Sequence, residues 1–338
     1  HYYLVSLISL LLVVLPSDAT WSVAAWWRAR RGREAPVVRL AHYGLLRAQL
    51  AIVYFFAGAA KLNGDWLLRA QPLRIWLRHF WEWPVVGPVF AWPGTAHGMS
   101  WFGAVFDLGV ALAMSFRRTR PLAWLLAVAF HVTIGLMFPI GVFSFVMLAS
   151  LTCFNEPQWP RRLLGRRAPA AAAPAPGGQV GAIHSAAGLS WSFYVFAVPY
   201  LCIQLLVPLR FALYPGWVNW TEQGFRFAWR VMLIEKTGHV DFHVTTSDPP
   251  RHWVTDGSSE LTRLQLKMMS TQPDMIHEYA LHLAERTRHE LGVSEVAVRA
   301  DAWVAFNGRR SQRLVDPEVD LAAQPRSLAH SSWILPLR

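Results

Sequence analysis

Long apolar segments alternate with short arginine-rich loops along most of the chain, and this pattern limits what the chain can fold into. Six apolar segments occur within its first 209 residues, at about 1–16, 43–61, 99–116, twice within 121–154, and at about 189–208. The stretch 121–154 is too long for one membrane span of about 20 residues, and Pro139 and Gly141 interrupt it. We therefore predict a hairpin of two spans there, within a polytopic, mainly α membrane protein.

Composition and charge agree with a membrane location. Hydrophobic residues make up 54% of the chain and charged residues 16%, whereas soluble domains carry about a quarter charged residues. The net charge of +11 could indicate nucleic-acid binding. However, residues 1–209 hold 17 Lys and Arg against 6 Asp and Glu, while residues 210–338 hold 15 of each. An excess confined to short loops between apolar segments indicates positive-inside topology and argues against a nucleic-acid partner.

The basic loops also predict an orientation. With six spans, the clusters within 28–33, 117–120 and 161–167 all fall on one side of the bilayer, which should be the cytoplasm. Residues 1–209 then form the helix bundle, with a disordered cytoplasmic linker at about 165–187, rich in Pro, Ala and Gly. Residues 210–338 face the lumen or periplasm. An Ala- and Arg-rich composition favours a bacterial plasma membrane over the endoplasmic reticulum.

From residue 210 the pattern is that of an α+β domain. We predict strands over 229–236, 239–246 and 295–306, because they are apolar or alternate in polarity. We predict a helix over 273–291, with Thr271 and Asp274 as its capping box and Gly292 as its end. Its apolar face would consist of Met275, Ile276, Tyr279, Ala280, Leu283 and Leu291.

Lys61 is the most informative single residue, because it ends an apolar helix. Removal from water disfavours a charged ammonium group, so a lysine at an apolar boundary can act as a base near neutral pH. The simpler interpretation is a lysine that anchors the helix end at the membrane interface, and position alone favours that interpretation. His1 is expected at a similar depth, where it could bond to Lys61. The chain starts at His1 without Met, inside an apolar run, so we expect it to be a piece of a longer protein.

Asp107 and His131 lie within predicted spans, where ionisable groups are costly and usually face a polar interior. Structural hydrogen bonding is the favoured interpretation for both, and polar support of a site is the alternative.

Cys153 and Cys202 lie in apolar stretches without metal-ligand spacing, so we predict neither a disulfide framework nor a metal site. The sequence 219–221 (Asn-Trp-Thr) is a glycosylation sequon, which has meaning only in a eukaryotic secretory pathway.

Several apolar residues are candidates for contact with a lipophilic ring substrate. Ile140, Phe143 and Met147 have the spacing of one helical stripe, and Tyr54 lies on the same face of its helix as Lys61. Met232 could cover such a pocket from the outer domain. Packing between helices is the more common origin of such stripes. The functional alternative predicts one cavity that reaches Lys61.

Taken together, these stretches resemble the vitamin K-dependent gamma-glutamyl carboxylase family and its bacterial relatives, the horizontally transferred transmembrane domain proteins. The matching pieces, in order, are 1–4 (HYYL), 54–66 (YFFAGAAKLNGDW), 130–131 (FH), 140–150 (IGVFSFVMLAS), 159–161 (WPR), 219–221 (NWT), 229 (W), 239–240 (HV), 303–304 (WV), 312–313 (QR), 316–320 (DPEVD) and 332–333 (SW). No single piece is specific, but their order and spacing hold along nearly the whole chain. Departures at Ile134, Leu136, Gly224 and Arg230 bear on quinone selectivity and substrate docking more than on the base.

The resemblance implies a carbon–carbon lyase in which Lys61 is the active-site base and His1 its partner. It places Tyr54, Ile140, Phe143, Met147 and Met232 near the quinone. The implied cofactor is reduced vitamin K, with oxygen and carbon dioxide as co-substrates and no metal. Oxidation of the hydroquinone to its epoxide would drive removal of a γ-proton from glutamate in a protein or peptide, and carbon dioxide would add to the carbanion. A dry pocket suits this chemistry, because water would quench both the base and the carbanion.

Two other functions stay open. A related membrane enzyme could form a quinone epoxide without carboxylating a protein, and a peptide-docking surface on the outer domain would distinguish the two. A non-catalytic scaffold or transporter would instead show inverted repeats or a central polar pathway, and the sequence contains neither.

Overall fold

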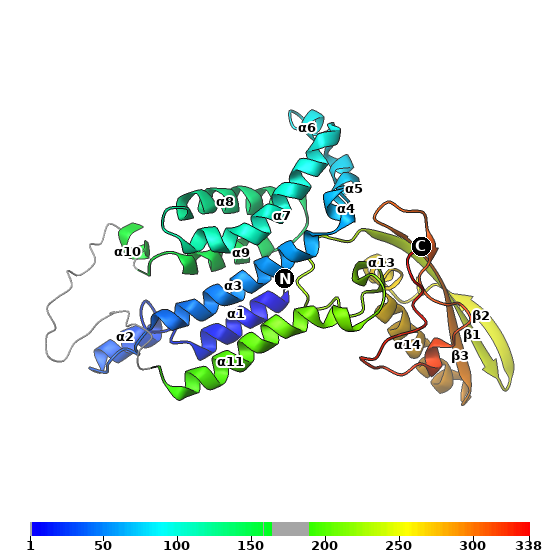
Figure 1. The fold of residues 1–338 in the computed structure, drawn as a ribbon. Helices are drawn as coiled ribbons and strands as arrows, with labels where there is room; N and C mark the ends of the chain where they lie inside the picture. Colours follow the sequence, from blue (N-terminus) through cyan, green and yellow to red (C-terminus); the bar gives the residue numbers. More distant parts are fainter. Residues whose placement is uncertain (1, 158, 164–188) are drawn as a thin grey trace. The chain divides into compact units, whose positions relative to one another are not determined.

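The structure, a computed structural model, describes residues 2–157, 159–163 and 189–338 (Figure 1). Chain contacts divide it into two compact units. Unit 1 consists of residues 1–56 and 105–206, and unit 2 of residues 57–104 and 207–338. His1 and the linker predicted over 165–187 lie outside the described residues.

Within the described residues, six apolar helices follow the order of the six predicted segments. Four of them are long and apolar enough to cross a membrane, judged by length and composition: α3 (Leu40–Lys61), α7 (Pro93–Ser115), α8 (Arg120–Met137), and Trp191–Leu213, which joins α11 (Trp191–Leu206) to the 3-10 helix η3 (Val207–Leu213). Two are shorter: α1 (Tyr2–Val14), and Phe143–Phe154, which joins α9 (Phe143–Leu151) to η2 (Thr152–Phe154). The prediction of a helical membrane part followed by an α+β domain is confirmed.

The hairpin of α8 and α9 forms where the sequence breaks the apolar run. Helix α8 ends at Met137, and α9 begins at Phe143 after Gly141, whose φ of +59° favours glycine. The two helices then pack against each other. They approach closely at Gly135, where an added Cβ would lie 3.2 Å from Ser144 Oγ.

The loops contain short helices that the apolar pattern does not predict. These are α2 (Val23–Arg30), α4 (Gly64–Leu67), α5 (Leu73–Leu77), η1 (Arg78–Phe80), α6 (Gly87–Ala91), α10 (Trp159–Leu163), α12 (Val218–Thr221) and η4 (Leu321–Ala323). Helices α4 to α6 belong to unit 2 together with the C-terminal residues.

The sheet of unit 2 has four antiparallel strands in the order β2-β1-β3-β4. Its strands are β1 (Lys236–Ser247), β2 (Pro250–Thr255), β3 (Val296–Phe306) and β4 (Gln312–Arg313). The strands predicted over 239–246 and 295–306 are therefore present. The strand predicted over 229–236 is wrong, since only Lys236 joins β1. Trp229 and Met232 have φ values of 56° and 59°, which extended strands exclude.

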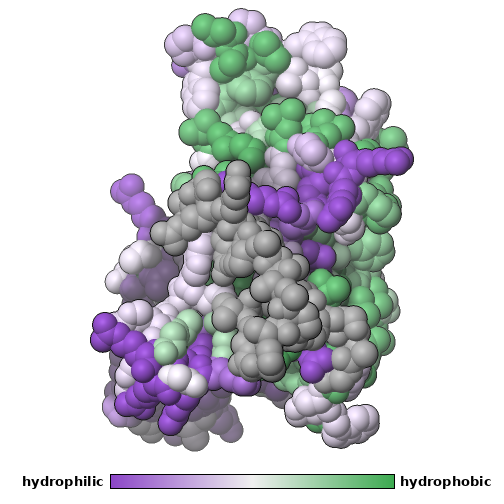
Figure 2. Space-filling model, turned by 90° about the vertical axis from the view of Figure 1, so that its left-hand side faces the viewer, coloured by the Kyte–Doolittle hydropathy of each residue, from purple (hydrophilic) through white to green (hydrophobic). Residues whose placement is uncertain are grey.

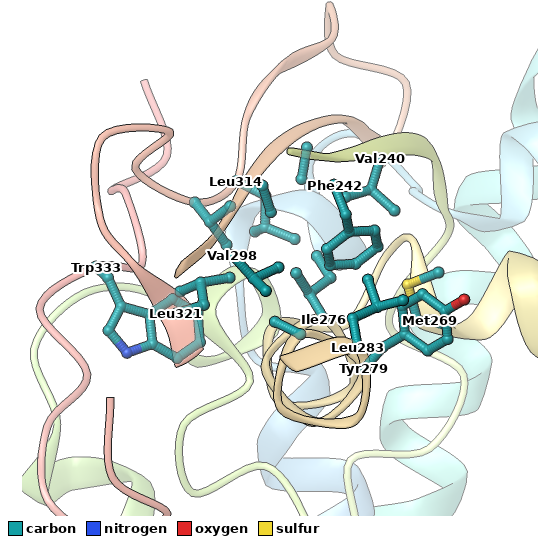
Figure 3. Packing of buried hydrophobic residues seen from close by; sticks show 14 of the residues in the cluster. Val240, Phe242, Met269, Ile276, Tyr279, Leu283, Val298, Leu314, Leu321 and Trp333 are labelled. Atoms are coloured by element: carbon teal, nitrogen blue, oxygen red, sulfur yellow. The ribbon is translucent and has the colours of Figure 1, made fainter. Parts of the chain in front are cut away.

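Two helices, α13 (Arg263–Met269) and α14 (Pro273–Leu291), accompany the sheet. Alternate residues of β1 and β3 are buried against α14, and Figure 3 shows Phe242, Val298, Ile276 and Leu283 within this core. Helix α14 has the predicted bounds and ends at Gly292 in the left-handed conformation.

Two details of the helix prediction are wrong. The N-cap of α14 is Gln272, which makes no side-chain capping bond. The predicted capping box does not form there, because the Thr271 hydroxyl donates to the Lys267 carbonyl and Asp274 pairs with Arg226. The capping box lies at the start of α13 instead, between Thr262 and Gln265. Leu291 is not part of the buried face of α14, because it is 37% exposed at the end of the helix.

Candidate active site around Lys61

Lys61 is the last residue of α3 and is only 5% exposed. Its Nζ donates to the Ala57 carbonyl at 3.3 Å and lies 5.3 Å from the centre of the Trp66 ring. A lysine that anchors a helix end keeps its ammonium group in water. The burial of Lys61 is therefore unlike that of an exposed anchor.

The turn after Lys61 is fixed by Asn63 and Trp66. The Asn63 side chain caps α4 by accepting from Trp66 N at 3.1 Å, and its Nδ2 donates to the Ala60 carbonyl at 2.8 Å. Trp66 is buried in a small apolar cluster with Leu73, Ala104 and Leu233. Its Nε1 donates to the Ser100 carbonyl at 2.7 Å. The ring beside Lys61 is thus held on several sides.

Asp65 connects this turn to the C-terminal part of unit 2. Its carboxylate is 5% exposed and accepts two bonds from Arg309, at 2.7 and 2.6 Å. Asn307 Nδ2 adds a third bond to the same carboxylate at 3.0 Å. A buried carboxylate is tolerated when it is paired and its oxygens are hydrogen-bonded in this way.

Arg309 and Asn307 are themselves held by the fold. The Arg309 guanidinium lies 5.3 and 5.4 Å from the ring centres of Trp217 and Phe306. Asn307 follows β3 with a φ of 47° and accepts from Glu235 N at 2.8 Å, while its Nδ2 also donates to the Leu233 carbonyl. The segment containing Leu233 therefore bonds to the same asparagine that contacts Asp65.

Met232 precedes Leu233 in this segment and is half-buried. Its φ of 59° makes it one of four non-glycine residues in the left-handed region between residues 222 and 232, the others being Glu222, Phe227 and Trp229. Such backbone strain persists only where the surrounding structure imposes it, and it concentrates at functional sites. The segment is thus a functional candidate independent of the sequence pattern.

Arg230 lies in the same segment, and burial lowers its pKa to about 10. Its guanidinium donates to Asn219 Oδ1 at 3.2 Å and lies 4.2 Å from the Phe211 ring centre. Asn219 is 1% exposed. A glycan on this buried, hydrogen-bonded side chain would not fit the structure described here.

A second group of candidates lies in unit 1. The Tyr54 hydroxyl and His131 Nε2 are 2.8 Å apart, and both side chains are buried. The Phe143 and Phe106 rings lie 6.3 and 6.2 Å from the His131 ring. Within the described residues, His131 Nδ1 has no hydrogen-bond partner. The contact between Tyr54 and His131 agrees with the structural role expected for His131.

The remaining predicted residues of unit 1 occupy different positions. Asp107 is buried on α7, and Met147 is buried on α9. Ile140 precedes α9, so it does not share a helical stripe with Phe143 and Met147. Sequence spacing was therefore misleading for Ile140. Lys61 and Met232 belong to unit 2, and the single cavity expected to join all of these residues stays a prediction.

Sequence reasoning missed Asp65, Asn307 and Arg309 as members of the site. Asp65 and Arg309 are 244 residues apart, and neither position belongs to a periodic pattern. The available signals were the place of Asp65 within the matching piece 54–66 and the position of Arg309 shortly after an apolar stretch.

Comparison with protein families covers both parts of the chain. Residues 1–159 match the HTTM domain, and residues 190–338 match the lumenal domain of the vitamin K-dependent gamma-carboxylase. No solved structure gives a significant match. The two matches follow each other in the order expected from the sequence motifs, and the apolar helices fall mainly in the first. The chain is therefore an integral membrane protein that belongs to the vitamin K-dependent gamma-carboxylase family.

Proposed function

We propose that the chain is a vitamin K-dependent gamma-glutamyl carboxylase-like enzyme, a carbon–carbon lyase that acts on glutamate in a protein or peptide. The observation that carries the proposal is the buried amine of Lys61 at the end of α3, beside the Trp66 ring. Membership of the family supplies the reaction class. The co-substrates would be oxygen and carbon dioxide.

Lys61 would serve as the base of the reaction. In this proposal its Nζ accepts the proton of a hydroquinone hydroxyl. Reduced vitamin K, when bound, supplies the reducing equivalents with which oxygen is converted into epoxide and water, and this drives removal of the γ-proton. His1 would orient or tune the amine, as the family resemblance implies.

The residues of unit 1 fit a quinone ring. The Tyr54, Phe143 and His131 rings supply an aromatic wall, and Met147 is an adaptable apolar neighbour. Within the described residues, the buried atoms His131 Nδ1 and Ser144 Oγ have no protein partner, so each could bond to a quinone oxygen. We propose that these residues hold the ring together with Ile140 and Met232, with Asp107 as polar support.

Asp65 and Arg309 would position the base rather than take part in chemistry. Asp65 lies four residues after Lys61, and the Arg309 fork fixes the backbone of this turn. Bidentate guanidinium–carboxylate pairs impose geometry as well as attraction. We infer that residues 207–338 thereby set the position of the Lys61 amine, and that they face the lumen or periplasm.

Two products measured in parallel test the proposal. Membranes containing the chain should convert vitamin K hydroquinone to its epoxide and incorporate labelled carbon dioxide into a glutamate-containing peptide. Both products should fall to background in Lys61→Ala. Epoxide without labelled peptide would instead favour the epoxidase alternative. Unchanged formation of both products in Lys61→Ala would refute the assignment of the base.

A further inference from the structure

A basic hollow and an apolar cavity adjoin each other at one end of unit 1. The hollow, of about 520 Å³, is lined by Arg117, Arg120 and Arg162. The cavity, of about 460 Å³, is lined mainly by apolar side chains of α1, α3 and the end of α9. Asn155 and Trp159 line both spaces. Neither space includes a residue that the proposed reaction uses.

The hollow carries a local excess of positive charge. Glu156 bonds to Arg117 at 2.5 Å and to Arg162 at 2.7 Å, which brings the two guanidinium groups together. Arg120 Nε donates to the Met114 carbonyl at 2.9 Å, so this third cation is held at the end of α7. The residues that line the hollow therefore include three arginines and one carboxylate, which pairs with two of them. The arrangement suits the binding of an anionic ligand.

The adjoining cavity suits an apolar chain. Leu12, Leu46 and Leu50 are among its lining residues. Its volume lies within the range of about 300–1,000 Å³ that is usual for small-molecule sites. Figure 2 looks at this end of the molecule and shows hydrophilic side chains directly beside hydrophobic ones.

Hydrogen bonds within the protein hold Asn155, which lines both spaces. Trp124 Nε1 donates to Asn155 Oδ1 at 2.8 Å. Arg47 donates to the Asn155 carbonyl at 3.4 Å and to the Cys153 carbonyl at 2.9 Å. The junction is therefore preformed, which lowers the cost of ordering it when a ligand binds.

We propose that this end of unit 1 binds an anionic glycerophospholipid, with its phosphate at the arginines and an acyl chain in the cavity. An anionic headgroup balances the excess positive charge, whereas a zwitterionic headgroup brings a cation of its own. Free phosphate would leave the apolar cavity unused. Trp159, which lines both spaces, belongs to a residue type enriched at membrane interfaces. The proposal is independent of the assignment of Lys61.

Native mass spectrometry of the full chain in detergent tests the headgroup. The chain should retain dioleoyl phosphatidylglycerol and should retain dioleoyl phosphatidylcholine far less. Each arginine near a lipid surface contributes about five-fold in binding, so Arg117→Gln with Arg162→Gln should weaken phosphatidylglycerol binding about 25-fold. The control is Arg118→Gln, an exposed neighbour that does not line the hollow. Equal retention of both lipids, or equal loss in the control, would overturn the proposal.

A second variant tests the acyl chain. Ser150 lines the cavity but not the hollow, so Ser150→Trp should fill the cavity and displace the lipid while the arginines stay in place. Its thermal unfolding should match that of the unaltered chain. If Ser150→Trp retains the lipid and millimolar inorganic phosphate removes it, the hollow is only a phosphate site and the lipid assignment is wrong. Epoxide formation by Ser150→Trp should be unchanged in detergent.

Discussion

At the scale of the residue, the burial of Lys61 separates its two interpretations. An anchoring lysine tolerates arginine, because both side chains keep a charged group at the interface. A base does not, because guanidinium stays protonated at accessible pH. Since Lys61 is 5% exposed, a bulkier guanidinium also meets close packing. Each variant therefore requires a measurement of folding beside its activity.

We expect Lys61→Arg and Lys61→Ala to lose epoxide formation alike, because neither offers a neutral amine. Small primary amines should restore part of the activity of Lys61→Ala, since they can occupy the vacated space and accept the proton. They should not restore Lys61→Arg, where the space is filled. Epoxide is measured by chromatography and folding by thermal unfolding. Full epoxide formation in a folded Lys61→Arg would return Lys61 to the role of anchor.

The Asp65–Arg309 pair gives a second residue-scale prediction. Asp65→Asn leaves a partly buried guanidinium uncompensated, so it should cost about 3–5 kcal/mol in the free energy of unfolding. Arg309→Lys should destabilise less but lose the bidentate geometry. Joint replacement by Asp65→Leu and Arg309→Met should recover much of the stability, because apolar pairs often replace buried ion pairs without loss.

Activity should not follow stability in that double variant. If the pair positions Lys61, epoxide formation should stay low although thermal unfolding is near that of the unaltered chain. The apparent affinity for the hydroquinone should change less than the turnover rate, because the turn around Asp65 positions the base. Recovery of both stability and turnover would show that the pair is only structural.

At the scale of the element, local sequence predicted helices better than irregular segments. The apolar runs and Pro139 with Gly141 defined the membrane helices, because burial and backbone geometry act there within a few residues. The segment 229–236 has the residue composition of a strand, yet contacts with Trp66 and Asn307 impose another backbone. Such tertiary contacts outweigh the intrinsic preference for a strand. Local sequence also did not reveal the role of Arg309, because its partner Asp65 belongs to an element that is distant in the sequence.

The capping box of α13 gives the element-scale prediction. Thr262 accepts from Gln265 N at 3.4 Å, and its backbone N–H donates to the Gln265 side chain at 2.9 Å. Thr262→Ala should cost about 1 kcal/mol locally, which accelerates hydrogen exchange of the first α13 amides about five-fold. Thr262→Ser keeps the oxygen and should exchange like the unaltered chain. Equal acceleration in Ser and Ala variants would contradict the capping role.

At the scale of the whole molecule, the order of membrane helices and C-terminal α+β domain could be predicted from the sequence. The length of an apolar segment and the charge of a loop are sums over many residues, so a wrong assignment of one residue changes the prediction little. The grouping of residues 57–104 with 207–338 could not be predicted. It depends on particular contacts, such as Trp76 Nε1 with Glu235 at 2.7 Å, that join distant parts of the chain.

The predicted sidedness of the chain gives the last prediction. If positive-inside topology holds, a cysteine replacing Arg118 should react with an impermeant maleimide only from the cytoplasmic side. A cysteine replacing Ser258, exposed in unit 2, should react only from the opposite side. Both positions require Cys153→Ser and Cys202→Ser first, because these cysteines are free thiols, and Cys202 is exposed. Labelling of intact and opened vesicles distinguishes the two sides. Reaction of both positions from one side would defeat the six-span topology, because that topology places three spans, an odd number, between Arg118 and Ser258.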